Sequence, residues 1–408
     1  MTSMLHLIPA HQARPSDDPI FALNREATER RQRGESIVNA TVGVLLDDDG
    51  KLAVLPTSAR AVADVPAAEW AEYAPIAGSP DFLAAVMDDL FVGEPELRAC
   101  SVAVATPGGS GALRHAIANF LEPRQAILTT SYFWGPYQTI ADEADRTLAT
   151  FSMFGPDGTI DVPAMELGLE AQILTQGRAL LFLNDPCNNP TGYSMRPEEW
   201  RAVAEKLATL GERAPVTLLV DVAYYAYAPR ERRAFLRELA PLLGKVCILF
   251  AWSASKTFTH YGLRVGALVA CVPDAKERAQ LQAALSYSSR GTWSNCTRGG
   301  QRAVTRLLTD PALAKACDAE RVELVNVLRA RTDAFNTLAA PRGIRYPRYE
   351  GGFFVTVFPR GDAAKRAAEL REKGVYVVPT QGALRVGLCS VAERDVPRLV
   401  DALATTVV

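Results

Sequence analysis

The chain has 408 residues, 48% of them hydrophobic, and is too long for one ordinary core, so we expect a large domain and a smaller one. Its 44 basic and 46 acidic residues leave a net charge of -2, which excludes the basic footprint of a nucleic-acid or anionic-membrane binder and favours a small-molecule substrate. No apolar run resembles a membrane span or a signal peptide, and the seven cysteines are scattered without a C-x-x-C pair. We therefore expect a soluble cytoplasmic protein with free thiols. Its four histidines lack ligand spacing, so we expect no metal site.

The hydrophobic pattern predicts a helix over 21–34, an extended segment over 36–43 and a turn at 47–51. Helices and strands then alternate in this order: helices 57–64 and 80–90, strand 101–105, helix 111–120, strand 125–129, helix 134–145, strand 179–183, helix 197–210, strands 216–224 and 245–252. This alternation implies a mostly parallel sheet in a three-layer α/β/α domain. A helical region follows, and then a compact α+β unit: helix 297–336 and segments 352–357, 363–372, 375–378, 384–388 and 391–405.

Lys256 follows the apolar run 245–252, which is typical of a buried parallel strand, so its amine should lie where open α/β sheets hold their ligands. Desolvation and the nearby charge of Arg264 favour the neutral amine, which attacks a carbonyl to form an imine. A lone lysine in such a place is more often a surface residue. Two other predicted strands argue against that interpretation, because they end in polar groups at the same edge: Asp221 with Tyr224, and the Asn184–Gly192 segment.

Pyridoxal phosphate is the usual aldehyde partner of such a lysine. A pyridine nitrogen needs a carboxylate to stay protonated and act as an electron sink, and Asp221 can supply it. The phenolate oxygen of the cofactor needs hydrogen-bond donors, which Asn189 and Tyr224 can supply. The polar residues at this edge of the sheet thus predict a cofactor site.

Residues 106–113, Thr-Pro-Gly-Gly-Ser-Gly-Ala-Leu, join a strand to a helix, so backbone amides and the hydroxyl of Ser110 can approach an anion at the positive helix end. The alternative is a tight turn with a capping serine, since the spacing fits neither the Rossmann nor the P-loop pattern. Ser253 and Arg264 favour a phosphate site, because both supply further donors and arginine binds phosphate in bidentate fashion.

Two arginines have no obvious partner in the sequence. Arg385, in a strand of Leu384, Val386 and Leu388, is either an edge residue facing water or a guanidinium aimed at a substrate carboxylate. Arg290 lies in a polar segment, and by itself a plain surface loop is the better interpretation.

Taken together, these residues resemble the fold-type I pyridoxal-phosphate aminotransferases, in the aspartate and aromatic aminotransferase branch, from about Asn39 to the C-terminus. The resemblance depends on the order and spacing of five motifs: Val38–Gly43 followed by Asp47–Lys51, Leu55-Pro56, Tyr73-Ala74-Pro75-Ile76-Ala77-Gly78, Asn189-Pro190-Thr191-Gly192, and Ser253-x-Ser255-Lys256 with Arg264. It implies a large cofactor-binding domain at 51–309 and a small substrate-closing domain, built from both termini, at 1–50 and 310–408.

The resemblance also implies roles for individual residues. Lys256 would hold the cofactor as an aldimine and later shuttle a proton, with Asp221 on the pyridinium nitrogen and Tyr224 and Asn189 on the ring oxygen. Trp134 would stack on the ring, and Arg385 would bind the substrate α-carboxylate. The phosphate would be held by Gly109, Ser110, Ser253 and Arg264, joined by Tyr73 from the other subunit of a homodimer. Arg290 would reach across the dimer to a side-chain carboxylate of the substrate. The rest of the substrate site would be formed by Gly43, Asn189 and Trp134.

The chain departs from the family pattern at two places. The family usually has two prolines where this chain has Cys296-Thr297, so the segment that carries Arg290 is expected to be placed differently. Histidines often lie behind the family's aspartate, and the matching positions here are Asn184 and Tyr137, so cofactor electronics are expected to be tuned differently.

The predicted function is transfer of an amino group from an L-amino acid, aspartate or aromatic, with glutamate and 2-oxoglutarate as the partner pair. The same apparatus could instead serve a lyase or decarboxylase, because fold alone does not settle chemistry. A regulator that senses an amino acid would need a DNA-binding module, which residues 1–38 are too few and too weakly basic to provide.

Overall fold

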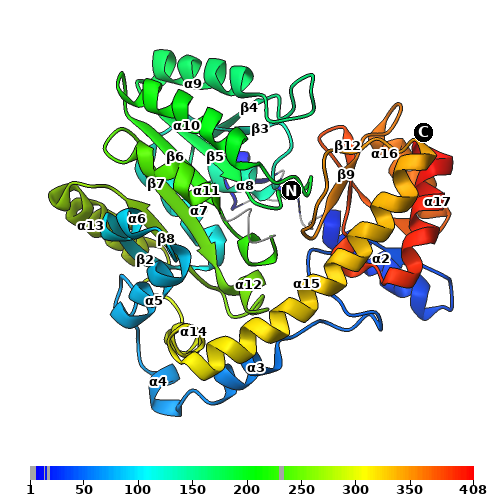
Figure 1. Ribbon diagram of the computed structural model, residues 1–408, viewed down its shortest axis with the longest axis horizontal. Coiled ribbons are helices and arrows are strands. Elements are labelled where there is room, and N and C mark those ends of the chain that lie inside the picture. Colours follow the sequence, from blue (N-terminus) through cyan, green and yellow to red (C-terminus); the bar gives the residue numbers. More distant parts are fainter. Residues whose placement is uncertain (1–5, 13, 16–18, 229–233) are drawn as a thin grey trace.

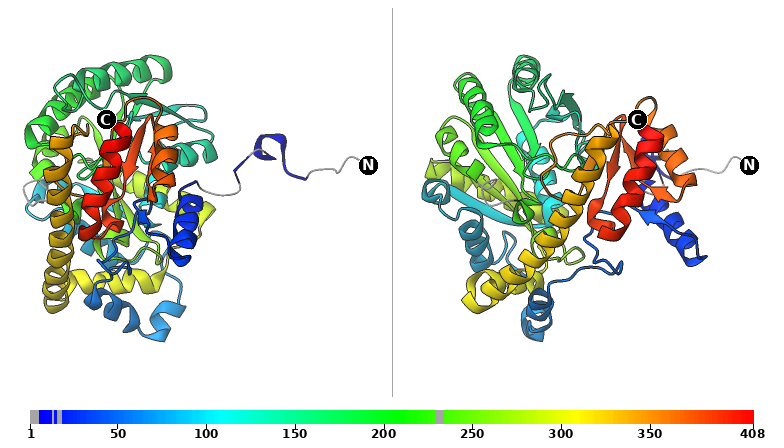
Figure 2. Two further views of the ribbon diagram at one scale, coloured as in Figure 1. Left: turned by 90° about the vertical axis from the view of Figure 1, so that its right-hand side faces the viewer. Right: turned by 45° about the vertical axis from the view of Figure 1, so that its right-hand side comes forward.

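The computed structural model describes residues 6–12, 14–15, 19–228 and 234–408. Across these ranges the chain forms two lobes, and the long helix α15 (Pro311–Ala339) runs from one to the other (Figure 1). The short helix α1 (Pro9–Gln12) lies away from the body of the molecule (Figure 2). Among the described residues, no helix combines the length and the apolar character that a membrane span requires.

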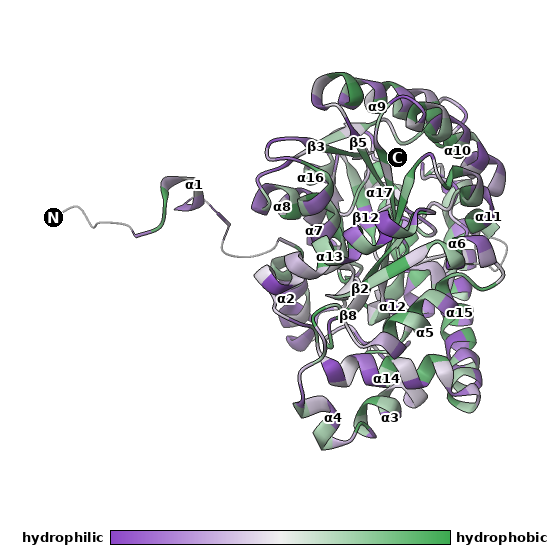
Figure 3. Cartoon of the chain, turned by 90° about the vertical axis from the view of Figure 1, so that its left-hand side faces the viewer, coloured by the Kyte–Doolittle hydropathy of each residue, from purple (hydrophilic) through white to green (hydrophobic). Residues whose placement is uncertain are grey.

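The larger lobe is built on a seven-stranded sheet whose strands are, in spatial order, β2 (Ser101–Pro107), β8 (Val265–Cys271), β7 (Cys247–Ser253), β6 (Val216–Asp221), β5 (Ala179–Asn184), β3 (Ala126–Thr130) and β4 (Thr147–Phe151). The pairings are parallel except for β8, which is antiparallel to both neighbours. Every residue of β5 and β6 is buried, as expected for strands covered on both faces, and the sheet is coloured mainly hydrophobic in Figure 3.

Helices cover both faces of this sheet. One face packs against α7 (Gly108–Phe120), α8 (Pro136–Glu143) and α13 (Ala275–Thr292). The opposite face packs against α5 (Pro80–Leu90), α6 (Pro95–Ala99), α9 (Val162–Gln176), α10 (Pro197–Gly211), α11 (Phe235–Leu239) and α14 (Arg298–Thr309). This arrangement confirms the predicted three-layer α/β/α fold with a mostly parallel sheet.

The smaller lobe is an α+β unit with a separate hydrophobic core. Its elements come from both ends of the chain: α2 (Pro19–Gln32), β1 (Val38–Asn39), β9 (Val355–Val357), α16 (Ala363–Glu372), β10 (Val375–Tyr376), β11 (Val378–Thr380), β12 (Ala383–Val386) and α17 (Val396–Val407). β1 pairs in parallel with β10, while β11, β12 and β9 form an antiparallel sheet. The lobe therefore depends on contact between segments more than 330 positions apart.

The predicted helical region over 297–336 is two helices. Asp310 caps the second one by accepting hydrogen bonds from the amides of Ala312 and Leu313, and Pro311 occupies its first turn. Early residues of α15, such as Cys317, belong to the core of the larger lobe, whereas Phe335 belongs to that of the smaller lobe. Because α15 contributes to both cores, the boundary near residue 310 stays a prediction.

Two strands and two long helices had no counterpart in the predicted order: β4, α9, β8 and α13. The short helices α1, α4 (Ala67–Ala71), α6, α11 and α12 (Ala254–Thr257) were not predicted either. β8 follows β7 through a short antiparallel connection, so the rule of helix and strand alternation did not apply to it. In α13 only Leu285 and Ser289 are buried, which leaves no apolar stripe to detect. The predicted strand over 216–224 ends at Asp221, since the chain turns into a 3-10 helix at Tyr225–Tyr227.

The short helices α3 (Pro56–Ala63) and α4 (Ala67–Ala71) pack against α14 at one end of the larger lobe (Figure 1). α12 (Ala254–Thr257) is a single turn that follows β7. This turn carries Lys256, so its place at the end of a buried strand sets the position of the amine.

Candidate active site

A cavity of about 520 Å³ lies between the two lobes, at the carboxyl edge of the central sheet. Both lobes contribute to its lining, the larger one through strand ends and α7 and the smaller one through Phe354 and Arg385. The predicted site residues that line it are Gly43, Gly109, Ser110, Trp134, Asn189, Asp221, Tyr224, Ser253, Lys256, Arg264 and Arg385. Tyr73 and Arg290 do not line it.

Strand register explains why residues from distant segments meet here. Asn184, the last residue of β5, pairs with Asp221, the last residue of β6, which pairs in turn with Ala251 of β7. Because parallel strands end at the same edge, Asp221 and Ser253 reach one rim of the cavity, and the turn after β7 places Lys256 beside them.

The Lys256 amine is held in the cavity without a carboxylate partner among the described residues. Its Nζ donates a hydrogen bond to the carbonyl oxygen of Gly43 at 2.7 Å and lies 4.5 Å from the centre of the Tyr261 ring. Burial lowers the pKa of Lys256 to about 8, and the positive charges of Arg264 and Arg385 act in the same direction. A sizeable fraction of the amine is therefore neutral near physiological pH, as a nucleophile or general base requires.

Asp221 is held by three donors. Tyr137 donates its hydroxyl to Oδ2 at 2.8 Å, Ala223 donates its amide to Oδ1 at 3.2 Å, and the Asn184 side chain donates to the Asp221 carbonyl oxygen at 2.8 Å. Burial raises the pKa of Asp221 to about 6, although the donated hydrogen bonds act in the opposite direction. A buried carboxylate of this kind is suited to a cationic N–H partner.

Asn189 and Tyr224 lie together on the neighbouring wall. The Asn189 amide nitrogen Nδ2 lies 3.4 Å from the Tyr224 hydroxyl, and the Asn189 backbone N–H donates to Asn184 Oδ1 at 2.7 Å. Burial keeps the pKa of Tyr224 far above its ordinary value, so the phenol stays protonated and can donate. Two neutral donors therefore face the cavity beside Asp221.

An anion cradle occupies the end of the cavity at the start of α7. Gly108 has φ of 69°, and a Cβ there would come within 2.5 Å of Arg264 Nη2, so only glycine lets the guanidinium approach this turn. Arg264 Nη1 donates to the Ser255 hydroxyl at 3.2 Å and to the Tyr261 carbonyl at 2.9 Å. Helix amides, serine hydroxyls and an arginine are the donor set that a phosphate group prefers, so this end of the cavity is suited to a phosphate.

Arg385 faces the cavity from the smaller lobe. It is 7% exposed, its Nη2 donates to the Thr41 carbonyl at 2.7 Å, and its guanidinium lies 4.7 Å from the centre of the Phe354 ring. The alternative of a water-facing edge residue is therefore wrong. Gly43 lies close by, where a Cβ would come within 3.0 Å of the Phe354 ring.

Tyr73 and Arg290 are on the outside of the larger lobe. Tyr73 is 83% exposed between α4 and α5. Arg290 is in the last turn of α13 rather than in a loop, is exposed, and donates from Nη1 to the Ser294 hydroxyl at 2.6 Å. Neither side chain reaches the cavity of its own chain, and their assignment to a partner's site stays a prediction.

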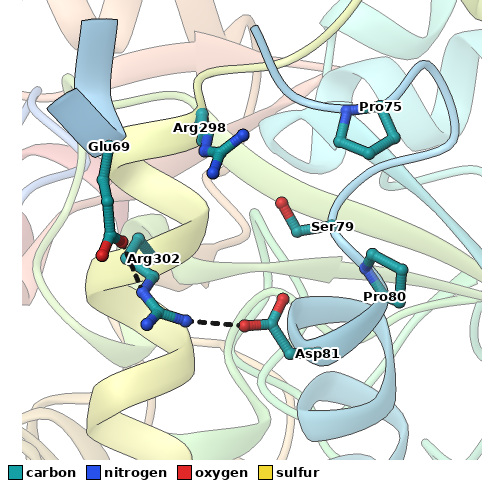
Figure 4. A pocket seen from close by; sticks show the side chains of 7 residues that line it. All are labelled: Glu69, Pro75, Ser79, Pro80, Asp81, Arg298 and Arg302. Carbon is teal, nitrogen blue, oxygen red and sulfur yellow. Dashed lines mark hydrogen bonds and ion pairs between the residues drawn. The ribbon is translucent and has the colours of Figure 1, made fainter. Parts of the chain in front are cut away.

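A second cavity, of about 300 Å³, lies near Tyr73 between α4, α5 and α14 (Figure 4). Arg302 pairs there with both Glu69 and Asp81 (Figure 4). Arg298 pairs with Glu72 at 2.8 Å and donates to the Tyr73 carbonyl at 3.4 Å. Its arginines are thus neutralised by carboxylates, and the cavity holds none of the predicted catalytic groups.

Several lining residues were not predicted from the sequence: Ile20, Phe21, Val42, Tyr261 and Phe354. Tyr261 lies only five positions after Lys256, across a short turn. This nearness in the sequence was the one signal that could have placed Tyr261 at the site. The others belong to segments whose contact with the cavity depends on how the lobes pack, so their sequence context carried no signal of its own.

An amine kept partly neutral, a carboxylate suited to a ring nitrogen and a phosphate cradle define an α/β enzyme that uses a phosphorylated aldehyde cofactor. Residues 35–403 match the aminotransferase class I and II family, and the chain belongs to that family. This membership confirms the predicted family and the aminotransferase activity.

Individual relatives support this assignment. The aromatic-amino-acid aminotransferase of Pseudomonas aeruginosa is 30% identical over 97% of this chain and 98% of its own length. The crystal structure of an aminotransferase from Anaerococcus prevotii superposes with a TM-score of 0.94 at 32% identity, covering 98% of this chain and 99% of its own. An aromatic-amino-acid aminotransferase from Burkholderia pseudomallei, covalently bound to pyridoxal phosphate, shares the fold with a TM-score of 0.80 at 23% identity, covering 98% and 100%.

Proposed function

We propose that this aminotransferase moves the amino group of an L-amino acid in the cavity between the lobes, with Lys256 as the catalytic amine. The cofactor is pyridoxal phosphate. The observation that carries the proposal is the meeting of Lys256, Asp221 and the Arg264 cradle in one cavity. These groups fit the aldehyde, the ring nitrogen and the phosphate of the cofactor, respectively.

When bound, the cofactor supplies an electron sink for the negative charge that develops at the substrate α-carbon. Asp221 would hold the ring nitrogen, Asn189 and Tyr224 would donate to the ring oxygen, and Trp134 would cover the ring face. The phosphate would be held by Gly109, Ser110, Ser253 and Arg264. Lys256, partly neutral near pH 8, would take the proton from the α-carbon and return it.

Arg385 would bind the substrate α-carboxylate, since its guanidinium fork faces the cavity beside Gly43. The apolar lining supports aromatic substrates: Ile20, Phe21, Val42, Leu113 and Phe354. Dicarboxylates such as aspartate and glutamate would use Arg290 of a partner subunit. The relatives named aromatic-amino-acid and aspartate aminotransferases support both substrate types.

The proposal includes a homodimer with shared sites. Tyr73 and Arg290 are exposed on the larger lobe, and each would complete the partner's site, Tyr73 at the phosphate and Arg290 at a side-chain carboxylate. All seven cysteines are free, which supports placement in the reducing cytoplasm.

A spectral titration tests the proposed function. Purified protein with pyridoxal phosphate is mixed with aspartate, glutamate or phenylalanine, and absorbance follows conversion of the lysine-bound cofactor to its pyridoxamine form. We expect conversion by both substrate types, and regeneration by 2-oxoglutarate. Turnover without an added amino acceptor would contradict transamination, and conversion by phenylalanine alone would contradict the dicarboxylate assignment.

A further inference from the structure

His115 is a buried titratable residue outside the cavity, and the proposed chemistry does not use it. It lies on α7, the helix whose first residues form the anion cradle, and it is completely buried. Its Nε2 is 2.9 Å from the Ser289 hydroxyl, and its ring lies 4.5 Å from the Trp293 ring at an interplanar angle of 36°. His115 therefore contacts residues on both sides of Arg290.

The turn that carries Arg290 is held from α7. Ser289 and Arg290 lie in the last turn of α13, which ends at Thr292. Trp293 caps this helix, and Ser294 adopts φ of 68°, an uncommon backbone conformation for a residue other than glycine. Ser294 in turn accepts the hydrogen bond from Arg290. The direction of the Arg290 side chain thus depends on a turn whose two ends meet His115.

Packing alone would not require a histidine here. Burial lowers the pKa of His115 to about 4, and the charge of Arg114 acts in the same direction, so the ring is neutral at ordinary pH. A neutral imidazole can stack on Trp293 and hydrogen-bond to Ser289 at the same time. Since Cys296-Thr297 follows this turn, no proline there restricts the backbone.

We propose that His115 is a positioning residue that sets the preference for dicarboxylate substrates by fixing the turn from which Arg290 extends. This rests on the proposed function, in which Arg290 binds a side-chain carboxylate in the partner's cavity. The same helix then positions the phosphate cradle of its own subunit and the arginine offered to the other subunit.

A matched control lies one turn further along the same helix pair. Asn119 Nδ2 donates to the Ser288 hydroxyl at 3.1 Å, which also joins α7 to α13, and to the backbone carbonyl of His115 at 2.8 Å, without contact to the imidazole ring. Its removal weakens the contact between the helices without touching Trp293 or Ser289. Asn119→Ala therefore separates general loosening of the helix pair from loss of the His115 contact.

The test uses the dimeric holoenzyme and the variants Arg290→Ala, His115→Phe, Ser289→Ala and Asn119→Ala. We expect His115→Phe and Ser289→Ala each to lower kcat/KM for aspartate roughly 3- to 10-fold, mainly through KM, with phenylalanine changed less than about twofold. Equilibrium binding of succinate should weaken by a similar factor, whereas binding of 3-phenylpropionate should not. Both variants remove the same hydrogen bond, so the double variant should lose little more than either single one.

The outcomes distinguish the two proposals. If Arg290→Ala weakens both substrates equally, the proposed role of Arg290 fails and the inference fails with it. If Arg290→Ala is selective but His115→Phe and Ser289→Ala are not, only the inference is overturned. The same holds if Asn119→Ala produces equal selectivity. Should His115→Phe fail to fold, Ser289→Ala alone decides between these results.

Discussion

The carboxyl edge of the central sheet and the outer surface of the larger lobe hold the two groups of predicted site residues in opposite environments. At the edge, Asp221 and Lys256 are enclosed, and burial shifts both pKa values toward neutrality. On the outside, Tyr73 and Arg290 are exposed. One folded chain thus creates the reactivity of an amine and a carboxylate, whereas Tyr73 and Arg290 could act on a cofactor or a substrate only within the homodimer that we propose.

Replacement of Lys256 tests the enclosed group most directly. Lys256→Ala should lower transamination by more than about 10⁴-fold, because the variant loses both the nucleophile and the proton carrier. Pyridoxal phosphate should still bind through the cradle near Arg264, as measured by equilibrium dialysis. Residual transamination close to the wild-type rate would contradict the assignment of the catalytic amine.

Asp221→Ala should have the next largest effect. Loss of the carboxylate leaves the ring nitrogen without an ionic partner in a buried site, and the transition state should be destabilised by about 3–5 kcal/mol. The rate of the chemical step, measured in single-turnover experiments, should fall by a similar factor for every substrate. A loss of activity confined to dicarboxylate substrates would instead point to an effect on the binding of their side-chain carboxylate by Arg290.

Arg290→Ala tests the exposed group. Loss of a desolvated charge pair should weaken dicarboxylate substrates by about 2–5 kcal/mol and leave aromatic ones nearly unchanged. The measurement is kcat/KM for aspartate and for phenylalanine. Equal losses for both classes would remove Arg290 from substrate recognition and leave the two regions without functional connection.

Tyr137→Phe is the mildest change at the sheet edge. It removes one hydrogen bond to Asp221 but keeps the ring, which packs edge-on against Phe182 and Trp134. The activation free energy that corresponds to kcat should therefore rise by about 1–2 kcal/mol. Tyr132→Phe, in the same segment but without a contact to Asp221, is the matched control. An unchanged kcat in Tyr137→Phe would show that the donor is dispensable.

The same variant has a pH signature in cofactor-free protein. Asp221 has a folded-state pKa of about 6, above the value of 3.8 expected when unfolded, so the folded state binds more protons between these values and its stability falls as pH rises through that window. Loss of the Tyr137 donor should raise the folded pKa further and extend the fall to higher pH. Urea unfolding from pH 4 to 8 measures the free energy of unfolding across this window. Asp221→Asn should abolish the part of its pH dependence that comes from Asp221.

Site residues at strand ends were predictable because each follows an apolar run that is buried on both faces. The carboxyl ends of β5, β6 and β7 place Asn184, Asp221 and Ser253 at one edge without any contribution from the smaller lobe. Prediction was weaker where a segment gave no periodic signal, as for α13, or where strands joined without a crossover, as for β8.

By itself, the sequence determined five of the seven strands of the central sheet and the residues able to hold a cofactor at their ends, because burial and strand direction follow from local apolar patterns. Only the tertiary structure decided that Arg385 faces inward, that the centre of the Phe353 ring lies 5.5 Å from the Lys256 amine, and that His115 contacts the turn that carries Arg290. Those contacts join segments far apart in the chain, and their geometry depends on how lobes and helices pack rather than on any neighbouring residue.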